Sequence, residues 1–194
     1  GSGGKPVAIP DVKSSSHEFE ECKPLPDRLH TAFKGSAARG NYLAADRCDA
    51  QFACKEVCRW MSSLQNSLDG AEESLSLLSS APRLVYRYPQ EAIEGINVHT
   101  DTDWAGCART RKSTSGGCVV LGHHAIKHWS STQSSVALSS GEAKIAGVIR
   151  GSGQVLGYQV LLQNFGVEAS LRVWTDSSAA IGICNRQGLG KLRH

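Results

Sequence analysis

Apolar and polar residues alternate in short runs through the second half of the chain. Runs of this kind predict β-strands, and four of them lie at 96–101, 117–121, 125–129 and 170–175. The short gap between the second and third runs, at 122–124, predicts a hairpin turn. We interpret the paired histidines in this gap as solvated side chains rather than metal ligands.

The longest apolar stretch has helical spacing. It runs from about Ser140 to Phe165, and a shorter helix is expected over 177–186. Two pairs of glycines, each four residues apart, would let the long helix lie close to a sheet: Gly147 with Gly151 and Gly153 with Gly157. Three hairpin-like strands, a crossover helix and a fourth strand predict an α/β fold with a mixed sheet.

The first half of the chain has a different pattern. Residues 1–28 are rich in Pro, Ser, Lys and Glu and lack periodicity, so we interpret them as a flexible lead-in. Apolar residues at three- and four-residue steps predict a mainly helical segment over 29–64, with a further helix over 69–80. Residues 84–88 have the composition of a strand, which Pro89 would end.

Charge is divided unevenly along the chain. We place a domain boundary at 89–95, between a first segment over 29–95 and a second domain over 96–194. The first 95 residues hold 11 Lys/Arg and 13 Asp/Glu, whereas residues 96–194 hold 10 and 5, within a total net charge of +3. The excess of +5 in the second domain favours nucleic acid as a partner.

No run of the sequence approaches the roughly 18–20 apolar residues of a membrane span, so we expect no membrane-spanning segment.

The seven cysteines do not form a metal or disulfide pattern. Their number is odd, and none of them makes a C-x-x-C pair. We interpret them as buried free thiols, which favours a reducing intracellular compartment. The start of the chain shows no signal-peptide pattern.

Three of the five acidic residues in the second domain stand at the ends of predicted elements. Asp101 ends the first strand, Asp176 follows the fourth strand, and Glu142 lies at the start of the long helix. In a basic domain, carboxylates at such positions are arranged like a divalent-metal site beside a polyanion. The pattern therefore indicates a candidate metal site.

Each of these carboxylates also has an ordinary structural explanation. Asp101 and the nearby Asp103 suit a turn at a strand end, and Asp176 suits a strand-to-helix junction. Ser139 and Glu142 have the spacing of a capping box, in which the carboxylate returns to the backbone N–H of the capping residue. Both interpretations stay open at this point.

Five motifs in the second domain give the sequence a family resemblance. They are Val-His-Thr-Asp-Thr-Asp-Trp-Ala-Gly at 98–106, Arg-Lys-Ser-Thr-Ser-Gly at 111–116, Trp-Ser-Ser at 129–131, Val-Ala-Leu-Ser-Ser-Gly-Glu-Ala at 136–143 and Trp-Thr-Asp-Ser-Ser-Ala-Ala-Ile at 174–181. In this order they resemble the ribonuclease H domain of copia-type LTR retroelement polyproteins. Residues 29–95, with Asn-Tyr-Leu-Ala-Ala-Asp-Arg-Cys-Asp-Ala-Gln-Phe at 41–52, resemble the tail of the preceding reverse transcriptase.

The resemblance implies a ribonuclease H-like mixed sheet and a metal-dependent endonuclease that cuts the RNA strand of RNA–DNA hybrids. It implies two Mg²⁺ ions, with Mn²⁺ as the alternative, held by Asp101, Glu142 and Asp176. The phosphates of the hybrid would contact Arg111 and Lys112.

Two departures from the family pattern change this expectation. The chain ends at 190–194, where the family places its fourth carboxylate, so we expect a C-terminally truncated domain that is inactive in this form. Lys144 stands two residues after Glu142, where the family usually has an acidic residue. The alternative is a retroelement-derived remnant that serves as a structural or interaction subunit, covered by a larger assembly. A third option is a nucleic-acid-binding module that does not cut.

Overall fold

The computed structural model describes residues 26–59, 61, 78 and 81–186, and it divides the chain into two compact units, Gly1–Tyr86 and Arg87–His194. Three expectations fall wholly or largely outside the described residues: the lead-in at 1–28, most of the helix at 69–80, and the chain end at 190–194. Of the lead-in, residues 27 and 28 belong to the first helix. Each unit is considered by itself.

Over its described residues, the first unit includes the helices α1 (Asp27–Leu43) and α2 (Gln51–Arg59). Phe33 and Ala37 of α1 are buried against residues that include Val57 and Cys58 of α2. A second small cluster is formed by Ala44, Ala50 and Cys54. The helical prediction for 29–64 is confirmed in type over the described residues, with a break at 44–50 between the two helices.

The strand predicted at 84–88 is wrong. Residues 81–94 have no regular secondary structure, and Val85 and Tyr88 are exposed. A strand is stable only when a neighbouring strand pairs with its backbone, and no described strand pairs with this segment. Apolar composition alone therefore misled the prediction here.

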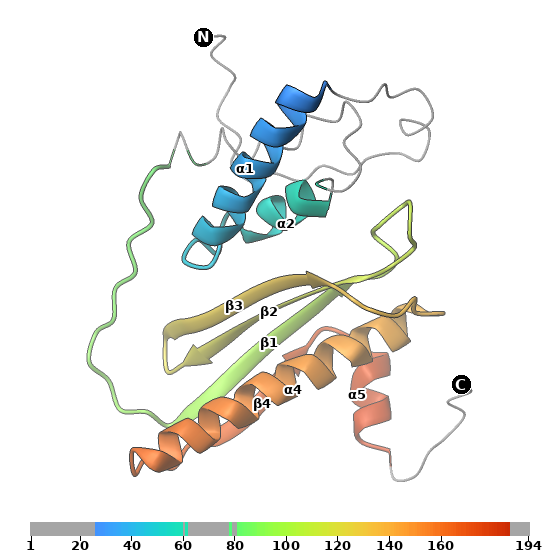
Figure 1. The fold of residues 1–194 in the computed structure, drawn as a ribbon. Helices are drawn as coiled ribbons and strands as arrows, with labels where there is room; N and C mark the ends of the chain where they lie inside the picture. Colours follow the sequence, from blue (N-terminus) through green and yellow to red (C-terminus); the bar gives the residue numbers. More distant parts are fainter. Residues whose placement is uncertain (1–25, 60, 62–77, 79–80, 187–194) are drawn as a thin grey trace. The chain divides into compact units, whose positions relative to one another are not determined.

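The second unit is built on a four-stranded sheet in the order β3-β2-β1-β4 (Figure 1). Its strands are β1 (Gly95–Asp103), β2 (Thr114–Leu121), β3 (His124–Thr132) and β4 (Ser170–Thr175). The β1–β2 and β2–β3 pairs are antiparallel, and β1–β4 is parallel. The predicted mixed sheet and its four strands are confirmed, although β2 begins earlier and β3 ends later than their apolar cores indicated.

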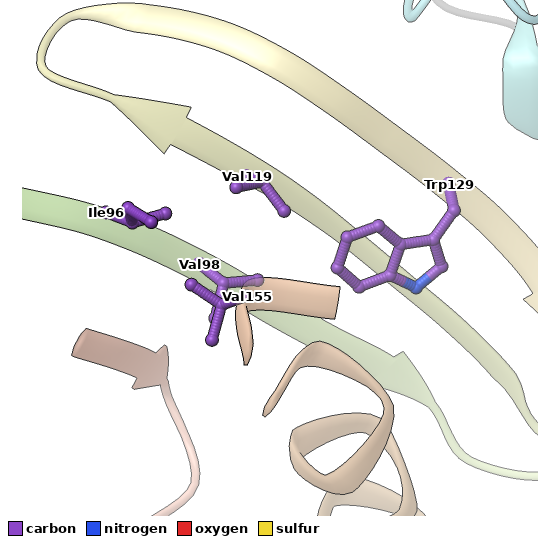
Figure 2. Close-up of a cluster of buried hydrophobic side chains, with 5 residues drawn as sticks. All are labelled: Ile96, Val98, Val119, Trp129 and Val155. Carbon is purple, nitrogen blue, oxygen red and sulfur yellow. The ribbon is translucent and has the colours of Figure 1, made fainter. Parts of the chain in front are cut away.

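Helix α4 (Ser140–Asn164) is the crossover between β3 and β4, and α5 (Ser178–Cys184) follows β4. The core between α4 and the sheet consists of one buried residue of α4, Val155, and four buried strand residues (Figure 2). These four are Ile96, Val98, Val119 and Trp129. Every second residue of β1 faces this core, which is the strand alternation seen in the sequence.

Only one of the two glycine pairs brings α4 close to the sheet. A methyl group at Gly147 would lie 2.5 Å from Thr102 Oγ1, and one at Gly151 would lie 2.5 Å from Thr100 Cγ2. Gly153 and Gly157 have no such neighbour within 4 Å. The first pair therefore fixes the approach of α4 to β1, and the prediction for the second pair is wrong.

Apolar side chains remain exposed on α4, among them Ile149, Leu156 and Val160, and Phe165 directly after the helix is exposed as well. Within the described residues, no helix is both long and apolar enough to cross a membrane. Cysteine burial is mixed, because Cys54 and Cys107 are buried, whereas Cys48 and Cys184 are exposed. The interpretation of the cysteines as buried thiols holds for only part of the set.

Candidate acidic site at the strand ends

Asp101 and Asp176 lie at the same edge of the sheet. Asp101 is near the end of β1, and Asp176 directly follows β4, whose last residue, Thr175, is in register with Thr100. Because β1 and β4 are parallel neighbours, their carboxyl ends bring the two carboxylates together. The side chains are 77% and 70% exposed, so both carboxylates are open to solvent.

Lys144 joins these two carboxylates. Its Nζ donates a hydrogen bond to Asp101 Oδ1 and another, of 2.7 Å, to Asp176 Oδ1. Asp101 Oδ1 also accepts the backbone N–H of Thr102 at 2.7 Å. The Lys144 side chain is only 14% exposed, in contrast to both of its partners. One ammonium group from α4 thus bridges the ends of two strands.

The electrostatics of the pair follow from this contact. The hydrogen bond from Lys144 lowers the pKa of Asp101 below its ordinary value, against the opposing effect of partial burial. Partial burial acts to lower the pKa of Lys144, but the hydrogen bonds to Asp101 and Asp176 outweigh it and raise that pKa. Lys144 is therefore an ammonium ion, and Asp101 a carboxylate, throughout the neutral pH range.

Glu142 lies in the first turn of α4, as predicted, but its carboxylate caps the helix. Ser139 Oγ accepts the backbone N–H of Glu142 at 3.2 Å, and Glu142 Oε2 accepts the backbone N–H of Leu138 at 2.7 Å. The capping-box interpretation is confirmed for Ser139, whereas the carboxylate returns to Leu138 instead of Ser139. Glu142 thus satisfies a backbone donor next to the helix N-terminus.

A divalent metal does not fit the described site as it stands. Between Asp101 and Asp176 the cation is already supplied by Lys144, and the Glu142 carboxylate is engaged at the helix cap. No group of three or more His, Cys, Asp or Glu side chains within the described part of the chain could hold a metal ion. The metal-binding role of Asp101, Glu142 and Asp176 stays a prediction.

The neighbouring Asp103 belongs to a turn. Its carboxylate lies directly against Gly106, where any side chain would collide with it. Ala105, between them, has a φ of 54°, in the left-handed region, and its backbone N–H donates to Ser113 Oγ at 3.1 Å. The turn-forming interpretation therefore describes Asp103.

The basic loop follows β1 at the same sheet edge. Its backbone is closed by hydrogen bonds from Arg111 N to Cys107 O at 2.7 Å and from Cys107 N to Lys112 O at 3.2 Å. Arg111 is exposed and has a φ of 57°, and Lys112 is half-buried. The two predicted phosphate-binding residues thus lie in a loop that continues directly from the strand of Asp101.

An open groove of about 470 Å³ lies beside the acidic pair, and it was not among the features expected from the sequence. It is lined by residues that include Asp101, Asp176, His99 and Trp174. The rings of His99 and Trp174 are nearly parallel, with centroids 6.1 Å apart, and Trp174 Nε1 donates to Asn97 Oδ1 at 3.0 Å. The alternation of residues along β1 could have indicated this groove, because His99 and Asp101 share one face of the strand.

Similar proteins point to a retrotransposon. The chain is 28% identical over 183 residues to a retrovirus-related Pol polyprotein from transposon RE2 of Arabidopsis thaliana, a match that covers 93% of this chain and 12% of the relative. The chain is 27% identical over 183 residues to the corresponding polyprotein from transposon RE1 of Arabidopsis thaliana, again covering 93% of this chain and 12% of the relative. An uncharacterized mitochondrial protein of Arabidopsis thaliana is 29% identical over 150 residues, covering 64% of this chain and 58% of that protein.

The two Pol polyproteins are homologues from copia-type transposons, and they support a retrotransposon origin for the chain. The predicted relationship to Pol polyproteins is confirmed at this level. The chain spans about an eighth of the length of the two polyproteins. No protein-family model and no solved structure matches it.

Proposed function

We propose that the second domain, residues 96–194, is a ribonuclease H-like domain, derived from a retrotransposon polyprotein, that binds RNA–DNA hybrids without cutting them. The observation that carries the proposal is the bridge from Lys144 to Asp101 and Asp176. It places a fixed cation at the sheet edge where the resemblance puts the catalytic carboxylates.

Support for the ribonuclease H-like assignment comes from the placement of three residues. Asp101 lies on β1, an inner strand of the sheet, beside the parallel strand that leads into Asp176. Glu142 begins the helix that crosses over between β3 and β4. These placements support the assignment.

Support for hybrid binding comes from charge and position. The second domain has twice as many basic as acidic residues, and the loop of Arg111 and Lys112 directly follows the strand of Asp101. Phosphates supply most of the affinity of a protein for nucleic acid. Contacts with the ribose 2′-hydroxyl would distinguish a hybrid from double-stranded DNA.

Lys144 favours binding over cutting. A divalent cation could enter the pair only if the ammonium left both carboxylates, and Mg²⁺ gives up its own hydration water reluctantly. Hydrolysis of the RNA strand with Mg²⁺ or Mn²⁺ is the second candidate function. It is favoured by the adjacent carboxylates of Asp101 and Asp176 and by the position of Glu142 in the first turn of α4, and it requires Lys144 to move.

Fluorescence anisotropy with a labelled RNA–DNA hybrid, over a series of salt concentrations, tests the binding. Arg111→Ala should weaken binding and reduce the slope of log affinity against log salt by about one. Lys127→Ala is a matched control, because Lys127 is exposed on β3 outside the basic loop. It should leave both quantities near the wild-type values.

The same preparation tests cutting. Incubation of the hybrid with the wild-type chain in Mg²⁺ or Mn²⁺ should give no cleavage beyond that seen with EDTA. Metal-dependent cleavage would replace the first candidate function with the second. Equal affinities for the hybrid in wild type and Arg111→Ala, with equal salt slopes, would exclude the proposed binding loop.

A further inference from the structure

We infer that the Lys144 ammonium is a built-in counter-ion that occupies the place of a metal cation between Asp101 and Asp176. The inference goes beyond the proposed function because it concerns the free protein and needs no hybrid to be bound. It rests on the two hydrogen bonds that Lys144 Nζ donates to the Oδ1 atoms of these residues.

The burial of the three side chains argues for a dedicated contact. Lysine side chains usually extend into solvent, and ordering one costs rotamer entropy. Lys144 is nonetheless 14% exposed, whereas Asp101 and Asp176 are 77% and 70% exposed. A buried ammonium is stable only with carboxylates or other acceptors around it. The two aspartates therefore satisfy Lys144 as much as Lys144 neutralises them.

The position of Lys144 on α4 separates it from the capping residue. Residues two apart on a helix point to different sides, so Glu142 reaches back to Leu138 while Lys144 reaches the strand ends. The charge of the strand-end cluster is consequently −1: two carboxylates and one ammonium. Without the ammonium it would be −2, and repulsion between the carboxylates would favour an external cation.

The chemistry of the pair defines which cation would take this place. Two carboxylates with open access to water are a sufficient protein contribution for Mg²⁺ or Mn²⁺, which keep several water ligands. Removing one positive charge about 4 Å away from such a divalent cation should strengthen binding by roughly thirtyfold even in a water-like environment. Lys144→Met removes the charge and retains an unbranched apolar side chain.

The test is a Mn²⁺ titration of the full chain, with free Mn²⁺ measured by electron paramagnetic resonance. Wild type should bind Mn²⁺ weakly at the aspartate pair, whereas Lys144→Met should gain a site there that binds Mn²⁺ roughly thirtyfold more tightly. Lys144→Arg, which keeps the charge, and Lys127→Met, which removes a lysine elsewhere in the sheet, should behave as wild type. Adding Asp101→Asn to Lys144→Met should abolish the gained site.

Equal Mn²⁺ affinity in wild type and folded Lys144→Met would overturn the inference. If Lys144→Met does not fold, the wild-type chain still decides. Mn²⁺ should then leave the amide NMR signals of Thr102 and Ser177 sharp, and selective broadening of both at low Mn²⁺ would show that the metal displaces Lys144. Loss of hybrid binding with these results intact would refute only the proposed function.

Discussion

The two units of the chain each hold a cationic side chain against carboxylates, but the contacts form over very different sequence distances. In the helical unit, Arg47 donates hydrogen bonds of 2.9 and 2.7 Å to Asp49, two residues away. In the sheet unit, Lys144 reaches Asp101 across 43 residues and Asp176 across 32. The first contact belongs to a single turn of chain, whereas the second exists only when β1, β4 and α4 are assembled.

The cores differ in the same way. The helical unit packs small side chains such as Ala44, Ala50 and Cys54, which bury little area each. The sheet unit packs branched and aromatic residues brought together from three strands and a helix. A local turn can place one ion pair, but a site that joins several elements needs the larger core beneath it. The chemistry of the acidic site is therefore tied to the stability of the sheet unit.

The largest expected effect is on the sheet core. Trp129→Ala should destabilise the sheet unit by about 3–5 kcal/mol, because it leaves a cavity between β3 and α4. Hydrogen exchange should show the loss of protection in β1, β2 and β3. Phe33→Ala is the matching change in the helical unit and should reduce protection in α1 instead. Loss of protection in the same elements for both variants would contradict the separation of the two cores.

The next effect separates capping from metal binding at the start of α4. Glu142→Ala should destabilise the sheet unit by about 1 kcal/mol, because the backbone N–H of Leu138 loses its acceptor. Glu142→Gln keeps an acceptor oxygen and should cost much less, as measured by chemical denaturation. An equal loss in the two variants would mean that the negative charge, and not the hydrogen bond, is what matters.

A smaller effect is expected for the local pair in the helical unit. Asp49→Asn should lower the free energy of unfolding by about 0.5–1 kcal/mol. The substitution removes the negative charge that lies against Arg47 while the side chain keeps its shape. Hydrogen exchange should localise the change to the turn between α1 and α2. Asp46→Asn, in the same turn, is the control and should be nearly neutral. A change that spreads into β1 or β4 would contradict the local character of this pair.

The smallest effect is a pH-dependent contact at the opposite end of the sheet unit. Glu91 accepts the backbone N–H of His123 at 2.6 Å and contacts its Nδ1 at 2.7 Å. Hydrogen bonds from the backbone N–H of His123 and then from its ring lower the pKa of Glu91 from its ordinary value of 4.5. The hydrogen bond to Glu91 in turn raises the pKa of His123 from its ordinary value of 6.5. The histidine contribution is complete below pH 6.5 and is lost as the pH rises through the raised pKa.

The carboxylate contribution is complete above pH 4.5 and is lost as the pH falls through the lowered pKa of Glu91. The contact is therefore strongest between these two values. In Glu91→Gln, an NMR titration should give His123 a pKa closer to 6.5 than in wild type. Glu94→Gln is the control. An unchanged His123 pKa in Glu91→Gln would show that the contact does not form in solution.

Most of the sheet unit could be predicted from its sequence. Strand β4 matches the predicted 170–175, and α4 matches the predicted helix to within a residue at its C-terminal end. These elements follow alternation and helical spacing over many residues, which single-sequence patterns record well. The segment at 84–88 has the same apolar composition, but its outcome depended on a pairing partner that composition does not reveal.

The acidic site could be predicted only in part. The sequence placed Asp101, Asp176 and Glu142 at the ends of elements, and the structure confirms those positions. It also singled out Lys144, two residues after Glu142, as a departure from the family pattern. It could not show that Lys144 reaches past Glu142 to both aspartates, because that depends on the packing of α4 against β1 at Gly147 and Gly151.

The most direct test of the central claim is a crystal structure of the chain grown in MnCl₂, with anomalous diffraction recorded for manganese. We predict the Lys144 ammonium between Asp101 and Asp176, and no anomalous peak at that position. A manganese peak between the two carboxylates, with Lys144 turned away into solvent, would contradict the claim that Lys144 takes the place of the metal.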